Sequence, residues 1–138
     1  MPIRLEIVTG ERLVYSDDVD AVVAPGVEGE LGVLPHHAAL MTTLQPGELR
    51  VTKGGQDILM AVSGGFMEVL PHKVTILADT AERADEIDEA RAEQARQKAQ
   101  KSLADAAKGN VDLAGAQAAM RRAVVRLKVA QKRKRRGL

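Results

Sequence analysis

Two pairs of charged residues in the C-terminal half have a spacing that suits binding of a phosphorylated ligand. Asp88 and Arg91 are three residues apart, and Arg122 and Arg126 are four apart, so each pair lies on one face of a helix. Guanidinium groups bind phosphate through paired N–H donors, and a carboxylate accepts hydrogen bonds from a base or a ribose. The spacing alone favours the simpler interpretation, which is ordinary ion pairs on a solvated helix face.

The other residues that could bind phosphate or a metal ion, or take part in catalysis, do not form a catalytic or metal-binding set. Three glycines recur every third residue in the segment 26–32, but no Gly-Lys-Ser/Thr and no helical pattern follows, so we interpret them as turn and bulge glycines. Cysteine is absent, so His36, His37 and His72 are expected to be surface or turn residues, and no metal site is predicted. No Ser/His/Asp arrangement or carboxylate pair indicates an enzyme.

Five consecutive cations, Lys132 to Arg136, stand near the end of the chain. Such a run binds nucleic acid, an anionic lipid surface or an acidic protein surface, and a solvated helix end explains it equally well. A nucleic-acid-binding adaptor that uses residues 121–136 is therefore the alternative function. Tyr15 and Phe66 are the only aromatic residues, which excludes a stacking platform for single-stranded nucleic acid.

The composition changes sharply near Ala84. Residues 1–84 carry 6 Lys/Arg and 12 Asp/Glu, a net charge of −6, whereas residues 85–138 carry 14 and 7, a net charge of +7. We predict two units with these boundaries, an acidic β domain and a basic helical region. A dipolar chain of this kind suggests an adaptor with two separate contacts and not an enzyme with one deep pocket.

Short apolar runs with period-two alternation fill the first unit. Turn residues such as Gly54-Gly55 and Pro71-His72 separate these runs. The runs cover residues 3–8, 19–23, 49–51, 58–62, 66–70 and 74–77. This spacing predicts an antiparallel β-sandwich or barrel, and no segment is long enough to form the crossover helices of a parallel sheet.

The second unit is rich in helix-forming residues. Asp85 is the predicted N-cap of a first helix, Gly109-Asn110 the predicted stop, and Asp112 the predicted cap of a second helix. The expected contact residues are mostly small: Ala92, Ala95, Ala99, Leu103 and Ala106, facing Leu113, Ala116, Met120, Ala123, Leu127 and Ala130. Alanine contacts bury little area, so this antiparallel two-helix hairpin is expected to undock and extend along a partner.

The chain resembles the ε subunit of bacterial F-type ATP synthases over essentially all of its length. Five segments carry the resemblance. They are residues 29–38 continuing to 44–47, residues 63–69, residues 74–79 followed by 81–83, Ile87-Asp88-x-x-Arg91-Ala92, and Arg122-Ala123-x-x-Arg126-Leu127.

The resemblance implies a ten-stranded antiparallel β-sandwich followed by the two-helix hairpin, in a non-catalytic subunit of the central rotor stalk. It implies that the sandwich holds the γ subunit and rests on the c-ring, with Glu30 and His37 at the c-ring contact. It also implies a hairpin that permits ATP hydrolysis when docked and suppresses it when extended beside γ into the catalytic α/β head. No signal pattern and no apolar stretch of roughly 20 residues is present, so a location on the cytoplasmic face of the inner membrane would be peripheral, through the complex.

The resemblance requires no cofactor but implies ATP as a possible regulatory ligand of the docked hairpin. The matching nucleotide-binding residues are Ile87, Asp88, Arg91, Ala92, Arg122 and Arg126. Lys98 stands where some ATP-binding members have another arginine. In the extended hairpin of the family, basic residues face an acidic segment of the β subunit, which gives the terminal cations a partner.

Overall fold

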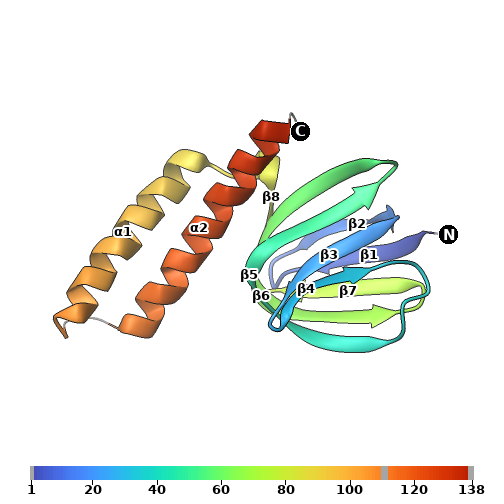
Figure 1. Ribbon diagram of the computed structural model, residues 1–138, viewed down its shortest axis with the longest axis horizontal. Helices are drawn as coiled ribbons and strands as arrows, with labels where there is room; N and C mark the ends of the chain where they lie inside the picture. The colour runs from blue at the N-terminus through green and yellow to red at the C-terminus, as the bar shows by residue number, and fades with distance from the viewer. Residues whose placement is uncertain (1, 110–111, 137–138) are drawn as a thin grey trace.

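The computed structural model describes residues 2–109 and 112–136, with side chains as far as residue 133. A β-sandwich is followed by two long antiparallel helices (Figure 1). The strands are β1 (Ile3–Val8), β2 (Leu13–Val19), β3 (Ala21–Gly26), β4 (Gly29–Val33), β5 (Leu40–Lys53), β6 (Gln56–Leu70), β7 (Lys73–Ala78) and β8 (Ala81–Arg83). A 3-10 turn η1 (Ala84–Glu86) leads into α1 (Glu89–Ala107) and α2 (Leu113–Arg136).

The predicted fold class is confirmed, but the strand count of ten is wrong, because the described residues form eight strands. The strands are ordered β2-β1-β7-β6-β5-β3-β4, with β8 paired to β6. β5 and β6 are 14 and 15 residues long and curve from one layer of the sandwich into the other (Figure 1). Their ladder is interrupted only between the pairs Leu44–Gly65 and Pro46–Ser63, so each counts as one continuous strand.

One strand pair departs from the expected antiparallel pattern. β1 pairs with β7 in parallel, with Leu5 opposite Val74 and Ile7 opposite Ile76. A parallel pair needs a long connection, and here the intervening strands β2 to β6 provide it in place of a crossover helix. The inward-facing residues of this pair are aliphatic and almost completely buried, as the period-two pattern predicts.

Both helices begin at an aspartate cap. The Asp88 side chain accepts a hydrogen bond from the Arg91 backbone N–H at 3.1 Å, so α1 begins three residues later than predicted. The prediction of Asp85 as N-cap is wrong because the chain first forms the turn η1, which buries Ala84 against the sandwich. The predicted Asp112 cap is confirmed, since its carboxylate accepts from the Ala114 N–H at 3.1 Å.

The end of α1 matches the predicted helix stop at Gly109. This glycine has a positive φ of 79° and its N–H donates to the Ala106 carbonyl, as at many helix C-termini. Asn110, the other half of the predicted stop, lies outside the described residues. None of the helices in the described part of the chain is long and apolar enough to cross a membrane.

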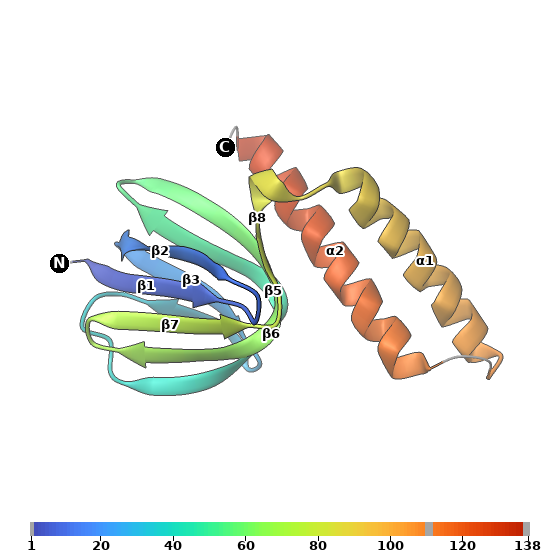
Figure 2. The same ribbon diagram turned by 180° about the vertical axis from the view of Figure 1, so that it is seen from behind.

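α2 lies between α1 and the sandwich (Figures 1 and 2). Alanines at the predicted positions are buried in the hairpin: Ala92, Ala99, Ala116, Ala123 and Ala130. Ala95 and Leu113, by contrast, are exposed, contrary to the predicted contact pattern. Val129, which the prediction omitted, is buried in a second small cluster with Leu59 and Ala61 of the sandwich, because α2 has two packing faces.

Candidate functional site between the hairpin and the sandwich

A cavity of 990 Å³ separates part of the hairpin from the end of the sandwich. α1, α2, the β1–β2 turn, the middle of β6, and residues 79–82 from the β7–β8 link into β8 form its walls. Its positively charged lining residues are Arg12, Lys98, Arg122 and Arg126. Its acidic and hydroxyl-bearing lining residues are Thr9, Glu11, Ser63, Asp79, Thr80, Glu82, Ser102 and Asp112. The cavity therefore offers both cations for phosphate and acceptors for a polar group.

Arg126 lines this cavity but already has an acidic partner on the sandwich. Its Nε lies 2.6 Å from Oε1 of Glu82, and its Nη2 donates to Oε2 at 3.1 Å. Six residues further along α2, Lys132 Nζ donates to both carboxylate oxygens of Glu48, at 3.0 and 2.8 Å. No local sequence pattern indicates either pair, because their members lie 44 and 84 residues apart.

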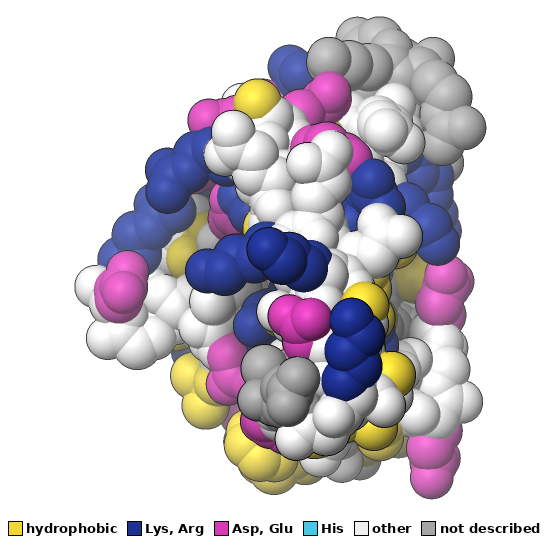
Figure 3. Space-filling view, turned by 90° about the vertical axis from the view of Figure 1, so that its left-hand side faces the viewer, with side chains coloured by type: hydrophobic (Ala, Val, Ile, Leu, Met, Phe, Trp, Pro, Cys, Tyr) yellow, Lys and Arg dark blue, Asp and Glu magenta, His cyan; other side chains and the backbone are white. Residues whose placement is uncertain are grey.

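Exposed cations cover much of the hairpin. Figure 3 shows Lys and Arg side chains gathered over the helical face of the molecule, with a smaller number of acidic side chains between them. The exposed cations of the described helices include Arg91, Lys98, Lys101, Arg121, Arg122 and Lys128. The basic composition of the second unit is thus displayed on its surface, where an acidic partner has access to it.

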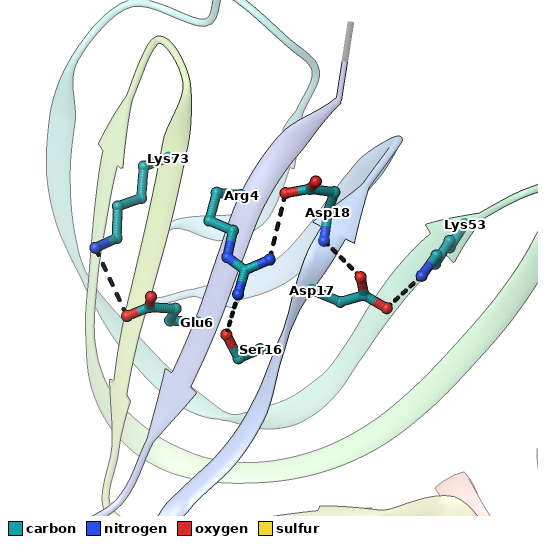
Figure 4. Close-up of polar contacts among 7 residues, drawn as sticks. All are labelled: Arg4, Glu6, Ser16, Asp17, Asp18, Lys53 and Lys73. Carbon is teal, nitrogen blue, oxygen red and sulfur yellow. Dashed lines mark hydrogen bonds and ion pairs between the residues drawn. The ribbon is translucent and has the colours of Figure 1, made fainter.

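One outer face of the sandwich carries a polar network near the start of β1 (Figure 4). Arg4 Nη2 donates to the Ser16 hydroxyl at 2.7 Å and Nη1 lies 3.4 Å from an Asp18 carboxylate oxygen. On the neighbouring strand of the same face, Lys73 Nζ lies 3.6 Å from a Glu6 oxygen. These contacts give Arg4, Asp18, Glu6 and Lys73 partners of opposite charge.

A separate ion pair beside this network joins Lys53 to Asp17 (Figure 4). The hydrogen bond from Lys53 holds the pKa of the Asp17 carboxyl below its usual range, and the neighbouring N–H of Asp18 adds to this effect. The same bond raises the pKa of Lys53.

The other half of this outer face is apolar. Strand register places one residue from each of five neighbouring strands in a single row: Thr43, Phe66, Leu77, Val8 and Leu13. Phe66 and Leu77 are each 54 % exposed and Leu13 is 56 % exposed. Met41, on the next row, is more exposed still. Clustered apolar side chains of this size on an otherwise polar sheet mark a contact surface.

Two family models together match residues 2–131 of the chain. The model for the ATP synthase delta/epsilon chain β-sandwich domain matches residues 2–84, and the model for the delta/epsilon chain long alpha-helix domain matches residues 85–131. The chain belongs to the ATP synthase delta/epsilon chain family. The resemblance found in the sequence is thereby confirmed.

Bacterial epsilon chains are close relatives of this delta/epsilon family member. The ATP synthase epsilon chain of Herpetosiphon aurantiacus is 61 % identical over 136 residues, which cover 99 % of each chain. That of Chloroflexus aggregans is 60 % identical over 131 residues, which cover 95 % of this chain and 94 % of the relative.

Solved structures share the fold of the delta/epsilon family at lower identity. A chain of the mitochondrial ATP synthase of Euglena gracilis superposes with a TM-score of 0.68 at 24 % identity, over 99 % of this chain and 82 % of that chain. A chain in the central stalk and c-ring of the Tetrahymena thermophila mitochondrial ATP synthase superposes with a TM-score of 0.56 at 18 % identity, over 96 % of each chain. These two likenesses concern the fold alone.

The six residues that match the nucleotide motif of epsilon chains do not share one cavity here. Arg122 and Arg126 line the large cavity together with Lys98. Ile87 instead lines a smaller cavity of 210 Å³ beside Arg133. Asp88 and Arg91, which were expected to converge with the two arginines, line neither cavity. Asp88 caps α1, and Arg91 is exposed. The remaining motif residue, Ala92, is buried in the hairpin.

The two residues that match the c-ring contact of epsilon chains lie in β4 and in the loop that follows it. Glu30 is exposed near the start of β4, opposite Pro25 of β3. His37 is half-buried and lies four residues beyond the end of β4, with its Nδ1 2.7 Å from the Ala38 carbonyl oxygen. Its loop lies at the end of the sandwich away from the hairpin (Figures 1 and 2).

The histidines near this loop contact each other in a pair. The rings of His36 and His72 meet edge to face with centroids 5.5 Å apart, and the His36 N–H donates to the Pro71 carbonyl at 2.9 Å. Across residues 2–109 and 112–133, no group of three or more His, Cys, Asp and Glu side chains is placed to hold a metal ion.

Proposed function

We propose that the chain is a non-catalytic subunit of the central rotor stalk of a proton-translocating F-type ATP synthase. It couples rotation to ATP synthesis and restrains ATP hydrolysis. The observation that carries this proposal is the similarity to epsilon chains across both units, combined with a hairpin that rests on the sandwich through one helix. Residues 1–84 are the unit that contacts the stalk, and residues 85–138 are the regulatory unit. The comparisons lend no support to a nucleic-acid-binding adaptor.

The γ subunit is the proposed occupant of the apolar row on the sandwich. A protein partner buries such a row in the apolar centre of an interface. Phe66→Asp is expected to abolish co-purification with γ, because it places a charge at the centre of the row. Leu34→Asp is the matched control, since Leu34 is exposed but lies in the β4–β5 loop outside the row. Equal retention of γ by both variants would contradict this docking surface.

Glu30 and His37 are the proposed contacts with the c-ring. Their support is the resemblance, together with the position of the His37 loop at the end of the sandwich remote from the hairpin. Replacing both residues by alanine is expected to weaken the coupling between ATP hydrolysis and proton pumping without unfolding the sandwich. Normal pumping in the double variant would contradict this assignment, and Glu28→Ala, which removes a nearby exposed acid, serves as the control.

ATP is the proposed regulatory ligand of the docked hairpin, held by Ile87, Asp88, Arg91, Ala92, Arg122 and Arg126. Support comes from the two arginines and Lys98 in one cavity. A phosphate that binds Arg126 must compete with Glu82 for its guanidinium group. Arg122→Ala and Arg126→Ala are expected to weaken ATP binding in calorimetry, whereas Arg121→Ala, on the same helix but outside the cavity lining, is expected to leave it unchanged.

The hairpin is the proposed brake of the complex. Docked, it leaves ATP hydrolysis active; extended into the catalytic α/β head, its exposed cations meet an acidic segment of the β subunit. The chain sits on the cytoplasmic face of the bacterial inner membrane only through the complex. Adding the full-length chain to an α/β/γ subcomplex is expected to lower ATP turnover. Unchanged turnover in complexes that contain the chain would contradict the proposal that the hairpin is a brake.

A further inference from the structure

The sandwich presents two acids, one on each side of an alanine, where α2 packs against it. Strand register pairs Glu48 of β5 with Ala61 of β6, and Ala61 with Glu82 of β8. The three residues therefore form one row across three neighbouring strands. Neighbouring strands lie about 4.8 Å apart, so the two acidic positions are about 9.6 Å apart along the row.

α2 carries the complementary pattern at the same spacing. Arg126, Val129 and Lys132 recur at every third residue, so they lie on one side of the helix. A helix rises about 1.5 Å per residue, so Arg126 and Lys132 are about 9 Å apart along the axis. The cation–apolar–cation row of α2 thus matches the acid–alanine–acid row of the sandwich in length, order and charge.

The two rows make contact position by position. Arg126 pairs with Glu82 through two nitrogen–oxygen contacts of 2.6 and 3.1 Å. Lys132 pairs with both carboxylate oxygens of Glu48. Between them Val129 is 1 % exposed and packs in the apolar cluster that covers the middle of the row.

These two ion pairs are the best shielded among the residues that the structure describes. The side chains of Arg126 and Glu82 are 27 % and 32 % exposed, and those of Lys132 and Glu48 are 30 % and 29 % exposed. In each of the other six described ion pairs both side chains are more exposed than these four. Shielded pairs lose less of their attraction to water and salt than exposed pairs do.

The attachment of the hairpin depends mainly on this helix. α2 makes the principal contacts with β5, β6 and η1, whereas α1 packs principally on α2. Whatever holds α2 on the sandwich therefore holds the whole hairpin in its docked position.

We propose that Arg126, Val129 and Lys132, seated on Glu82, Ala61 and Glu48, form a docking clamp that selects the docked hairpin. The clamp adds a residue-level contact to the proposed regulation. This inference depends on the proposed function, in which the hairpin is the mobile element. It gives Lys132, the first residue of the terminal basic run, a role in holding the hairpin down. When a phosphate binds Arg126, the Lys132–Glu48 pair is the charged part of the clamp that remains.

Double electron–electron resonance on the full-length chain tests the clamp. Spin labels on Gln56→Cys and Gln117→Cys report the distance between the β5–β6 turn and α2; both positions are exposed, and the chain has no native cysteine. A single main distance is expected for the otherwise unchanged chain. Glu48→Gln or Lys132→Gln is expected to lower the docked-to-released ratio about two- to fivefold, as loss of one ion pair does. The exchange Glu48→Lys with Lys132→Glu is expected to restore it.

Lys128→Gln is the matched control, because it removes the same charge from an exposed position of the same helix. The clamp is overturned if the Glu48 and Lys132 variants give the same distances as this control, or if the charge exchange releases the hairpin as fully as both neutral substitutions together. The measurement needs no other subunit, so it is independent of the brake. If the clamp variants release the hairpin but leave hydrolysis by the α/β/γ subcomplex unchanged, the clamp stands and the proposed brake fails.

Discussion

Gly65 lies where β6 passes from one layer of the sandwich to the other. Its φ is +110°, and a Cβ atom there would lie 2.0 Å from the backbone oxygen of Leu77. No flexible side chain can move to relieve this clash, so Gly65→Ala is expected to lower the free energy of unfolding by about 2–4 kcal/mol. Urea denaturation measures it. Gly32→Ala, with no atom within 4 Å of the added Cβ, is the control, and equal losses would contradict the account.

The Asp17–Lys53 pair predicts a pH dependence. Because the pKa of Asp17 is lower in the folded chain than its ordinary value of 3.8, the pair adds stability above that value and loses it as the pH falls through the folded pKa. Asp17→Asn is therefore expected to be slightly less stable than the unchanged chain at pH 7, with the difference shrinking below about pH 4. Thermal unfolding at several pH values measures this difference.

Asp85→Asn is the control for the Asp17 prediction, because it removes an exposed acid that is not among the groups acting on Asp17 or Lys53. The stability of this control variant is expected to remain close to that of the unchanged chain at every pH measured. A difference between Asp17→Asn and the unchanged chain that grows as the pH falls below about 4 would contradict the predicted sign.

Among the secondary-structure elements, α1 offers a test of which aspartate begins the helix. Asp88→Ala removes the side-chain acceptor at its N-terminus and is expected to cost about 0.5–2 kcal/mol of helix stability. Asp85→Ala is expected to leave helicity unchanged, because Asp85 lies in η1. Thermal melting followed by far-UV circular dichroism compares the two, and an equal loss in both variants would contradict the assigned cap.

Asp88→Ser separates capping from ligand binding. Serine retains the capping oxygen but removes the carboxylate, so the helix is expected to persist. If the carboxylate of Asp88 also binds ATP as proposed, the serine variant loses nucleotide affinity in calorimetry while keeping its helicity. Unchanged affinity would leave Asp88 as a cap alone.

The elements that the sequence predicts well are those specified by local pattern. Short apolar runs with period-two patterning predicted β1 and β7, and local cap chemistry identified Gly109 and Asp112. The exposed Ala95 and the buried Val129 were missed because helical periodicity does not say how many neighbours a helix has. The continuity of β5 and β6 was missed because Gly and Pro also mark turns, and here they mark bends within strands.

The candidate site was less predictable than the fold because its contacts join distant parts of the chain. Arg122 and Arg126 were identified by motif, but the sandwich residues that line the same cavity carry no local signal. The Lys132–Glu48 pair joins residues 84 positions apart, which no pattern within a helix or a strand can indicate.

The whole molecule is dipolar, with the basic hairpin seated by one helix on the acidic sandwich. The sequence predicted the opposite charges of the two units but not the side chains through which they meet. Shielded charge pairs around one apolar residue give an attachment that is specific in position but modest in strength. An element attached in this way can dock and release, as the proposed brake requires.

The most direct test measures ATP hydrolysis by an α/β/γ subcomplex containing the full-length chain with its hairpin either free or fixed. Glu48→Cys with Lys132→Cys provides the only thiols of the chain, and a short bismaleimide between them holds α2 on the sandwich. With equal incorporation confirmed, turnover is expected to be suppressed by the unbridged variant and restored by the bridged one. Equal turnover with bridged and unbridged chains would contradict the claim that release of the hairpin is what restrains hydrolysis.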